Sequence, residues 1–89
     1  MKKIVVFGSK YWSSCEPMKE FLSSNGIKFV YMDITEGLFN LKSYLKLRDT
    51  RPEFDEIKAR GIVGIPFIMI NNGEKLIFDE NPDLNELRD

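Results

Sequence analysis

The segment from Lys3 to Phe29 constrains the fold of this chain more than any other part. Lys3–Phe7 is a short run of apolar, mostly β-branched residues, which predicts a strand buried on both faces. A loop and a helix follow, and Ile27–Met32 predicts a second strand. Because strand–helix–strand units make right-handed crossovers, we expect the two strands to lie parallel in one sheet.

The helix between these strands is expected to begin at Ser13 or Ser14. Ser13 followed by Glu16 matches a capping box, in which each side chain accepts a hydrogen bond from a backbone amide at the helix start. Pro17 is tolerated only in the first helical turn, which agrees with that start. Gly26 is typical of the position just past the end of a helix.

Two further helices are predicted in the middle of the chain. Apolar residues repeat with helical period from Leu38 to about Arg48, and this pattern predicts a helix whose leucine stripe lies in the core. Thr50 and Glu53 match a second capping box, so a third helix should start there and end at Gly61. The predicted core stripe consists of Leu38, Leu41 and Leu45.

The last third of the chain predicts a hairpin and a short helix. Phe67–Ile70 and Lys75–Phe78 flank the turn residues Asn71-Asn72-Gly73. Pro82 then stands at an expected first helical position, with Leu84 and Leu87 behind it. The expected fold is one α/β domain over residues 1–89. It has a four-stranded mixed sheet flanked by helices, in the order β-α-β-α-β-β-α.

Composition excludes several classes of function. The chain has 43% hydrophobic and 30% charged residues and a net charge of −1, so we expect neither a nucleic-acid nor a membrane partner. No apolar run is long enough to span a bilayer or form a signal-peptide core. With one cysteine and no histidine, no metal site is predicted and a Cys–His hydrolase is excluded. A cytoplasmic monomer is expected.

Cys15, the single cysteine, is the candidate reactive group. In the first turn of a helix it would face unpaired N–H groups and the positive end of the helix dipole. Such positions lower the pKa of a thiol; Lys19 would add to this effect and Glu16 would oppose it. The alternative is that Cys15 is a packing residue, since free cysteines are among the most buried residues.

Two motifs and the order of elements resemble the glutaredoxin form of the thioredoxin-like family. The motifs are Trp12-Ser13-Ser14-Cys15 and Gly64-Ile65-Pro66-Phe67, and the resemblance extends from Ile4 to about Phe78. Lys42–Pro66 is also similar to small bacterial glutaredoxin-related proteins. The resemblance implies a thioredoxin-like fold and thiol–disulfide exchange with protein thiols or disulfides. It implies no tightly bound cofactor, with glutathione as a candidate co-substrate.

The resemblance also assigns the two catalytic positions. Trp12 stands where the family has its nucleophilic cysteine, and Cys15 stands at the resolving position. Dithiol chemistry is therefore absent from the chain with tryptophan at position 12. The tryptophan codon UGG and the selenocysteine codon UGA differ by one base, so position 12 is also a candidate selenocysteine. An iron–sulfur cluster would use the same position and is not expected.

The resemblance further implies a substrate site around the motif. Ser13 and Ser14 lie within the motif, and Ile65 precedes Pro66, whose peptide bond is cis in the family and trans in the alternative of an edge strand. The family's Gly-Gly-Asp segment, which binds glutathione, has no match; Phe78-Asp79-Glu80 stands there instead. Three cations are either glutathione carboxylate ligands or solvated surface residues. They are Lys10, Arg48 and Arg51.

Two classes of function follow from these features. The first is a glutaredoxin-like thiol–disulfide oxidoreductase, acting through a chalcogen at position 12 or through Cys15 alone. The second is a non-catalytic thioredoxin-fold module that binds a peptide or protein beside Ile65 and Trp12. The codon at position 12 and the pKa of Cys15 distinguish these alternatives.

Overall fold

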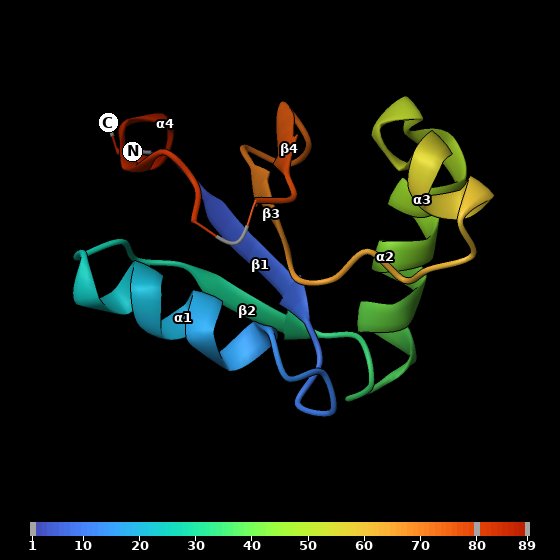
Figure 1. The fold of residues 1–89 in the computed structure, drawn as a ribbon, viewed down its shortest axis with the longest axis horizontal. Helices are drawn as coiled ribbons and strands as arrows, with labels where there is room; N and C mark the ends of the chain where they lie inside the picture. The colour runs from blue at the N-terminus through green and yellow to red at the C-terminus, as the bar shows by residue number, and fades with distance from the viewer. Residues whose placement is uncertain (1, 80, 89) are drawn as a thin grey trace.

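A four-stranded sheet in the order β2-β1-β3-β4 forms the centre of the protein (Figure 1). The computed structural model describes residues 2–79 and 81–88. Its strands are β1 (Ile4–Gly8), β2 (Val30–Asp33), β3 (Phe67–Ile70) and β4 (Lys75–Ile77). β1 pairs parallel with β2 and antiparallel with β3, and β3 pairs antiparallel with β4. The expected α/β fold with a four-stranded mixed sheet is confirmed.

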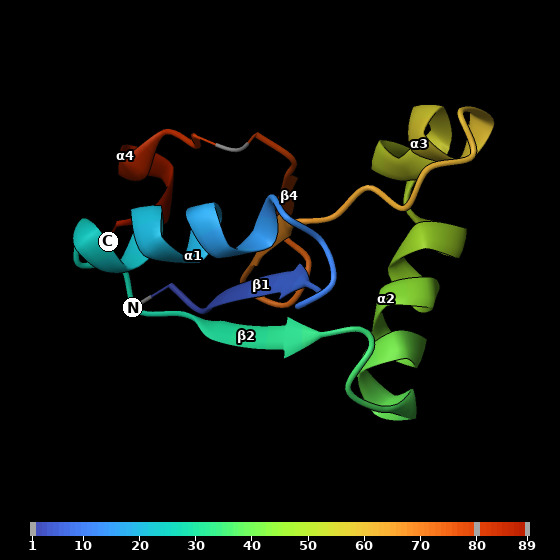
Figure 2. The ribbon, with the colours of Figure 1, turned by 60° about the horizontal axis from the view of Figure 1, so that its bottom comes forward.

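Helices lie on both sides of this sheet (Figures 1 and 2). They are α1 (Cys15–Ser24), α2 (Leu38–Thr50), α3 (Asp55–Ala59) and α4 (Leu84–Leu87). A 3-10 turn, η1 (Pro52–Phe54), leads into α3. Among the described residues, no helix is long and apolar enough to cross a membrane.

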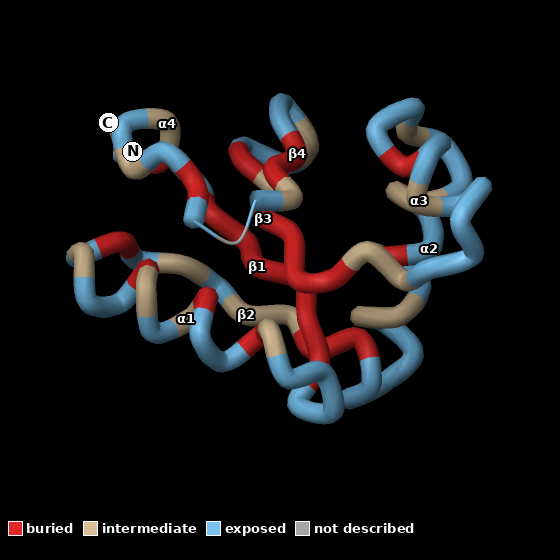
Figure 3. The backbone as a smooth tube through the Cα atoms, viewed as in Figure 1, coloured by how far each residue is buried: buried red, intermediate tan, exposed pale blue. Residues whose placement is uncertain are grey.

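The alternation of side chains along β1 creates two apolar cores. Ile4 and Val6 point to one face, where they pack with residues of α1 and α4 such as Leu22 and Leu87. Val5 and Phe7 point to the other face, toward the aromatic side chains of α2 and η1. The tube coloured by burial is accordingly red along β1 (Figure 3). The sheet is thus the middle of three layers.

The second core is mainly aromatic. The rings of Phe7 and Phe67 stack at 4.8 Å between centroids, nearly parallel at 7°. Phe54 meets Phe67 edge-to-face at 5.2 Å, and Phe78 lies 5.5 Å from Phe67. Because aromatic pairs prefer stacked and edge-to-face arrangements at such distances, this cluster anchors η1 to the sheet.

The hairpin is confirmed, and several boundaries differ by a few residues. Asn71, Asn72 and Gly73 have φ of 49°, 59° and 115°, the left-handed conformation that asparagine and glycine tolerate. β2 begins at Val30, three residues later than expected, although Ile27 is buried. α4 begins two residues after Pro82, because the carboxylate of Asp83 caps it by accepting from Asn85 N–H.

Both predicted capping boxes are wrong. α1 starts at Cys15, and Ser14 before it is already close to helical conformation, so no side chain caps the helix. α2 continues through Thr50, where the hydroxyl donates to the carbonyl of Lys46 at 2.5 Å instead of capping the next helix. At Thr50, a bond to the preceding backbone therefore replaces the cap.

The prediction that the leucine stripe of α2 lies in the core is also wrong. Leu38 is 77% exposed and Leu45 39% exposed, while Leu41 is half-buried. Within α2, whose residues are all described, only Tyr44 is fully buried. In Figure 2, α2 stands across the end of the sheet, and only the part around Tyr44 is buried.

We expect replacement of Leu38 by alanine to leave the free energy of unfolding within about 0.5 kcal/mol of the parent, because its side chain is exposed. The matched change Leu22→Ala should cost about 2–5 kcal/mol, because that side chain is fully buried under β1. Urea denaturation measures both. Equal losses would contradict the placement of α2.

Candidate functional site

The end of β1, the loop after it and the start of α1 form the candidate site. Ser9 N–H donates to the sulfur of Cys15 at 3.3 Å, so the loop folds back over the thiol. The backbone N–H of Cys15 donates to the carbonyl of Trp12 at 3.1 Å, closing a tight turn between the two predicted catalytic positions. Cys15 is 1% exposed, whereas Trp12 is 45% exposed.

Gly8 is required by the packing around Cys15. A Cβ atom at Gly8 would lie 2.8 Å from the sulfur of Cys15 and 2.8 Å from the hydroxyl oxygen of Tyr31. Both distances are well below van der Waals contact, so any larger residue would displace the thiol or the phenol. The sulfur is therefore enclosed by β1, the following loop and Tyr31 of β2.

Of the two alternatives for Cys15, the structure favours the packing residue over the thiol with a lowered pKa, because the side chain is buried. Burial raises the pKa of the thiol, and this effect exceeds the opposing hydrogen bonds from Ser9 N–H and with the Tyr31 hydroxyl. The nearby charge of Asp33 also raises it, while Lys19 lowers it. The sequence argument considered the first helical turn but could not include the enclosure of the sulfur, which favours the neutral thiol.

Ser13 and Ser14, both predicted substrate contacts, line a cavity of about 290 Å³ beside the start of α1. Pro17 and Met18 form its helical side, and Asn81 approaches from the segment after β4. The cavity thus lies next to the motif and combines hydroxyl and amide groups with an apolar wall.

The second motif lies at the same end of the sheet. The peptide bond between Ile65 and Pro66 is cis, as the resemblance implied. Phe67, the next residue, pairs with Phe7 of β1, which brings Pro66 level with Gly8. Ile65 is buried in the same apolar cluster as Cys15. The structure therefore brings both motifs together.

The three candidate carboxylate-binding cations do not form one group. Lys10 pairs with Glu36 at 2.8 Å on the surface near the site. Arg48 donates to the carbonyl of Ile62 at 2.9 Å, beside the segment that leads to the cis bond. Arg51 is at the other end of the sheet.

Arg51 is held by two interactions far from Cys15. It pairs with Glu53 at 2.7 Å and donates to the carbonyl of Gly73 in the hairpin turn at 2.7 Å. That turn bonds to Lys3, before the start of β1, whereas Cys15 packs at the end of β1. The structure therefore places Arg51 away from the motif.

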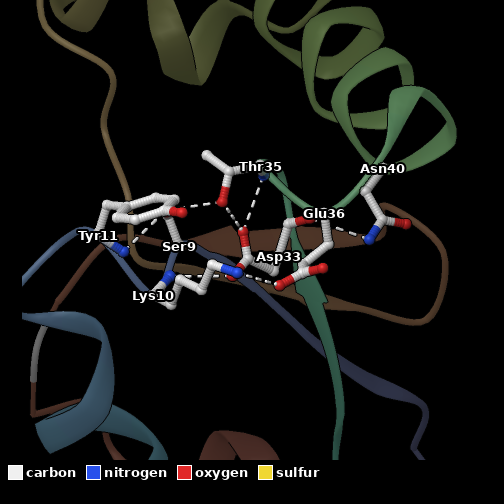
Figure 4. Close-up of polar contacts among 7 residues, drawn as sticks. All are labelled: Ser9, Lys10, Tyr11, Asp33, Thr35, Glu36 and Asn40. Atoms are coloured by element: carbon white, nitrogen blue, oxygen red, sulfur yellow. Dashed lines mark hydrogen bonds and ion pairs between the residues drawn. The ribbon is translucent and has the colours of Figure 1, made fainter.

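Asp33, which the sequence analysis did not single out, connects the loops after β1 and β2 (Figure 4). The residue is 7% exposed, and its carboxylate accepts from the backbone N–H of Lys10 at 2.9 Å and of Thr35 at 2.8 Å. The hydroxyl of Thr35 lies 3.1 Å from that of Ser9, which accepts from Tyr11 N–H. An aspartate followed two residues later by threonine at a strand end is the turn signal that could have revealed this network.

These hydrogen bonds determine the charge state of Asp33. Burial alone would raise the pKa of the carboxyl, but the bonds from Thr35 and from Lys10 N–H outweigh burial and lower it. The loop that covers Cys15 is therefore held by an ionised carboxylate at neutral pH.

Among residues 2–79 and 81–88, no group of three or more histidine, cysteine, aspartate or glutamate side chains could hold a metal ion.

The chain is 32% identical over 88 residues to an uncharacterized protein from Haemophilus influenzae, covering 99% of this chain and 96% of that protein. It therefore belongs to one family with the Haemophilus protein. No family model matches the chain, and no solved structure matches it.

We expect Cys15 to react with iodoacetamide at least about tenfold more slowly in the native protein than in urea, because the reagent needs local opening. The alkylation rate of the native protein should reach half its maximum at a higher pH than the rate of the unfolded chain, since burial raises the thiol pKa. Ionisation then favours the unfolded state, so this thiol's contribution to stability is lost as pH rises past the unfolded pKa of about 8.5. A native midpoint below the unfolded one would contradict this description.

Replacing Asp33 by alanine should cost about 1–3 kcal/mol of stability at neutral pH, because several backbone donors lose a buried acceptor. Since the folded pKa of Asp33 is lowered, its contribution is present above the unfolded pKa of about 3.9 and is lost as pH falls. The difference between parent and variant should therefore shrink in acid. Urea denaturation of parent and variant, at neutral pH and again in acid, measures this difference. Replacement of the exposed Asp79 by alanine is the control. A difference that does not depend on pH would argue against the ionised carboxylate.

Proposed function

We propose that the protein is a thioredoxin-like domain of the glutaredoxin type. Support comes from the parallel pair β1 and β2 joined by α1, and from the antiparallel pair β3 and β4. The cis bond before β3, level with the end of β1, agrees with the family's second motif.

The proposed activity is thiol–disulfide exchange, with position 12 as the attacking position and Cys15 as the resolving thiol. The observation that carries this proposal is the contrast in exposure between the two positions. Residue 12 is 45% exposed and Cys15 is 1% exposed, although a single turn joins them. Exchange needs one group that reaches the substrate and a second, protected group that releases it.

Tryptophan cannot attack a disulfide, so the proposed chemistry needs a chalcogen at position 12. We propose selenocysteine, whose UGA codon has been read as tryptophan. The selenolate attacks a substrate disulfide, forms a selenium–sulfur bond and releases one thiolate. Cys15 then loses its proton, and its thiolate attacks selenium, breaks the bond between selenium and the substrate sulfur and leaves an internal selenium–sulfur bond. The second substrate sulfur leaves as a thiolate and takes up a proton. The substrate has gained two electrons and the protein has lost them.

The substrate side of this proposal rests on the cavity next to the motif. The cavity of about 290 Å³ is lined by the hydroxyl groups of Ser13 and Ser14 and by Asn81. Such groups suit the peptide-like amides and carboxylates of glutathione, the proposed co-substrate, or of a protein disulfide. The protein would act as a monomer in a reducing cytoplasm.

A second candidate function is a non-catalytic module that binds a peptide beside the cis-proline. The observation that favours it is the enclosure of Cys15, whose pKa is raised rather than lowered. Trp12, half exposed at the same end of the sheet, would then be the main contact, as tryptophan often is at interfaces.

The change Trp12→Cys distinguishes the two. We expect this variant to form an internal disulfide with Cys15, seen as the loss of two hydrogens in intact mass spectrometry. It should also reduce glutathione mixed disulfides at least about tenfold faster than the tryptophan form, since an exposed thiolate now has a resolving partner. Trp12→Ser and the double variant Trp12→Cys/Cys15→Ser are the matched controls.

A folded Trp12→Cys variant that is no faster than Trp12→Ser would favour the binding module. The codon at position 12 of the source gene tests the remaining step, because UGG would exclude selenocysteine there.

A further inference from the structure

Figure 2 shows the start of the chain, α4 and the end of α1 gathered at one end of the molecule. A second cavity lies among these segments, at the opposite end of β1 from Cys15. Its volume is about 220 Å³. Roughly seven water molecules occupy this volume in liquid water. This cavity shares no lining residue with the one beside Ser13. The residues that line it are Lys2, Ile4, Gly26, Ile27, Lys28, Leu87 and Arg88.

The floor of this cavity is apolar and well ordered by packing. Ile4, Ile27 and Leu87 are 4%, 7% and 4% exposed, and all three belong to the core between α1, α4 and the sheet. A ligand with an apolar part would therefore cover existing core side chains and would need no rearrangement of the sheet.

The rim is cationic. Arg88 is held by the backbone, since one terminal nitrogen donates to the carbonyl of Asn25 at 3.2 Å. The ammonium group of Lys2 donates to the carbonyl of Glu86 at 2.8 Å. Lys28 is exposed at the turn between α1 and β2. Each cation therefore borders the same hollow from a different segment of the chain.

The charges of Lys28 and Arg88 are not neutralised within the part of the chain that the structure describes. Lys10, Lys19, Arg51 and Lys75 each pair with a glutamate, but neither Lys28 nor Arg88 pairs with a described carboxylate. Among residues 2–79 and 81–88, no carboxylate lines the cavity either. The carbonyl groups at the end of α1 disfavour an anion there, but Arg88 already binds one of them.

We propose that this cavity binds a small amphipathic anion, a phosphate or carboxylate group attached to a compact apolar body. The guanidinium of Arg88 has donors left for two oxygen atoms of such a group, and Lys28 adds a second charge. The apolar body would rest on Ile4, Ile27 and Leu87. This inference does not depend on Cys15 or on the proposed redox activity.

Phenyl phosphate is the probe, followed by amide chemical shifts in a titration of the full chain at about 0.15 M salt. We expect saturable shifts at Gly26, Lys28 and Leu87. Benzyl alcohol, which lacks the charge, and inorganic phosphate, which lacks the ring, should each bind at least about tenfold more weakly. Shifts centred on Ser13 and Asn81 instead, or inorganic phosphate binding as tightly, would overturn the proposal.

Arg88→Gln and Lys28→Gln should each weaken phenyl phosphate binding by about three- to tenfold. Lys46→Gln removes the same charge from α2 and should leave the affinity unchanged. Lys28 makes no hydrogen bond to a described group, so its replacement tests the site even if loss of Arg88 impairs folding. Equal weakening by Lys46→Gln would show a general charge effect and refute a built site.

Discussion

The structure depends on β1 being enclosed on all sides. Its five residues are buried, its two edges pair with β2 and β3, and its two faces contribute to separate cores. A strand in this position has no surface left for function, so polar chemistry is confined to its two ends. At one end lie the two motifs, and at the other lies the cationic cavity. The length of β1, about 3.3 Å per residue, separates them by roughly 16 Å.

The close approach at Gly8 determines what Cys15 can do. The sulfur and the Tyr31 hydroxyl occupy the space where a side chain at Gly8 would begin, and Ser9 N–H donates to the sulfur. The start of a helix favours a thiolate, but enclosure disfavours any charge, and here enclosure is the larger effect. In the proposed exchange, a thiol in this position would act in the second step, after the group at position 12 has attacked the substrate.

Much of the fold could be predicted because its signals are local. β-branched runs, a crossover helix and the Asn-Asn-Gly turn specify strands, order and hairpin without knowledge of the rest of the chain. The leucine stripe of α2 could not be judged in this way, because periodicity shows that a helix has an apolar face but not whether a sheet extends far enough to cover it. The second capping box failed because the hydroxyl of Thr50 bonds to a carbonyl of the preceding helix, and the first because Ser14 already has a nearly helical backbone.

The candidate site shows the same division between local and long-range information. The turn from Trp12 to Cys15 and the cis bond at Pro66 lie within short motifs. The raised pKa of Cys15 arises first from burial, to which Tyr31 of the neighbouring strand β2 contributes by enclosing the sulfur, and then from the charge of Asp33 on that strand. Asp33 also holds the loop that covers the thiol, through Lys10 and Thr35. Since the carboxyl ends of parallel strands meet at one edge of a sheet, the residues after β1 and β2 become neighbours only when the crossover forms. The environment of Cys15 is therefore a property of the whole β1–α1–β2 unit.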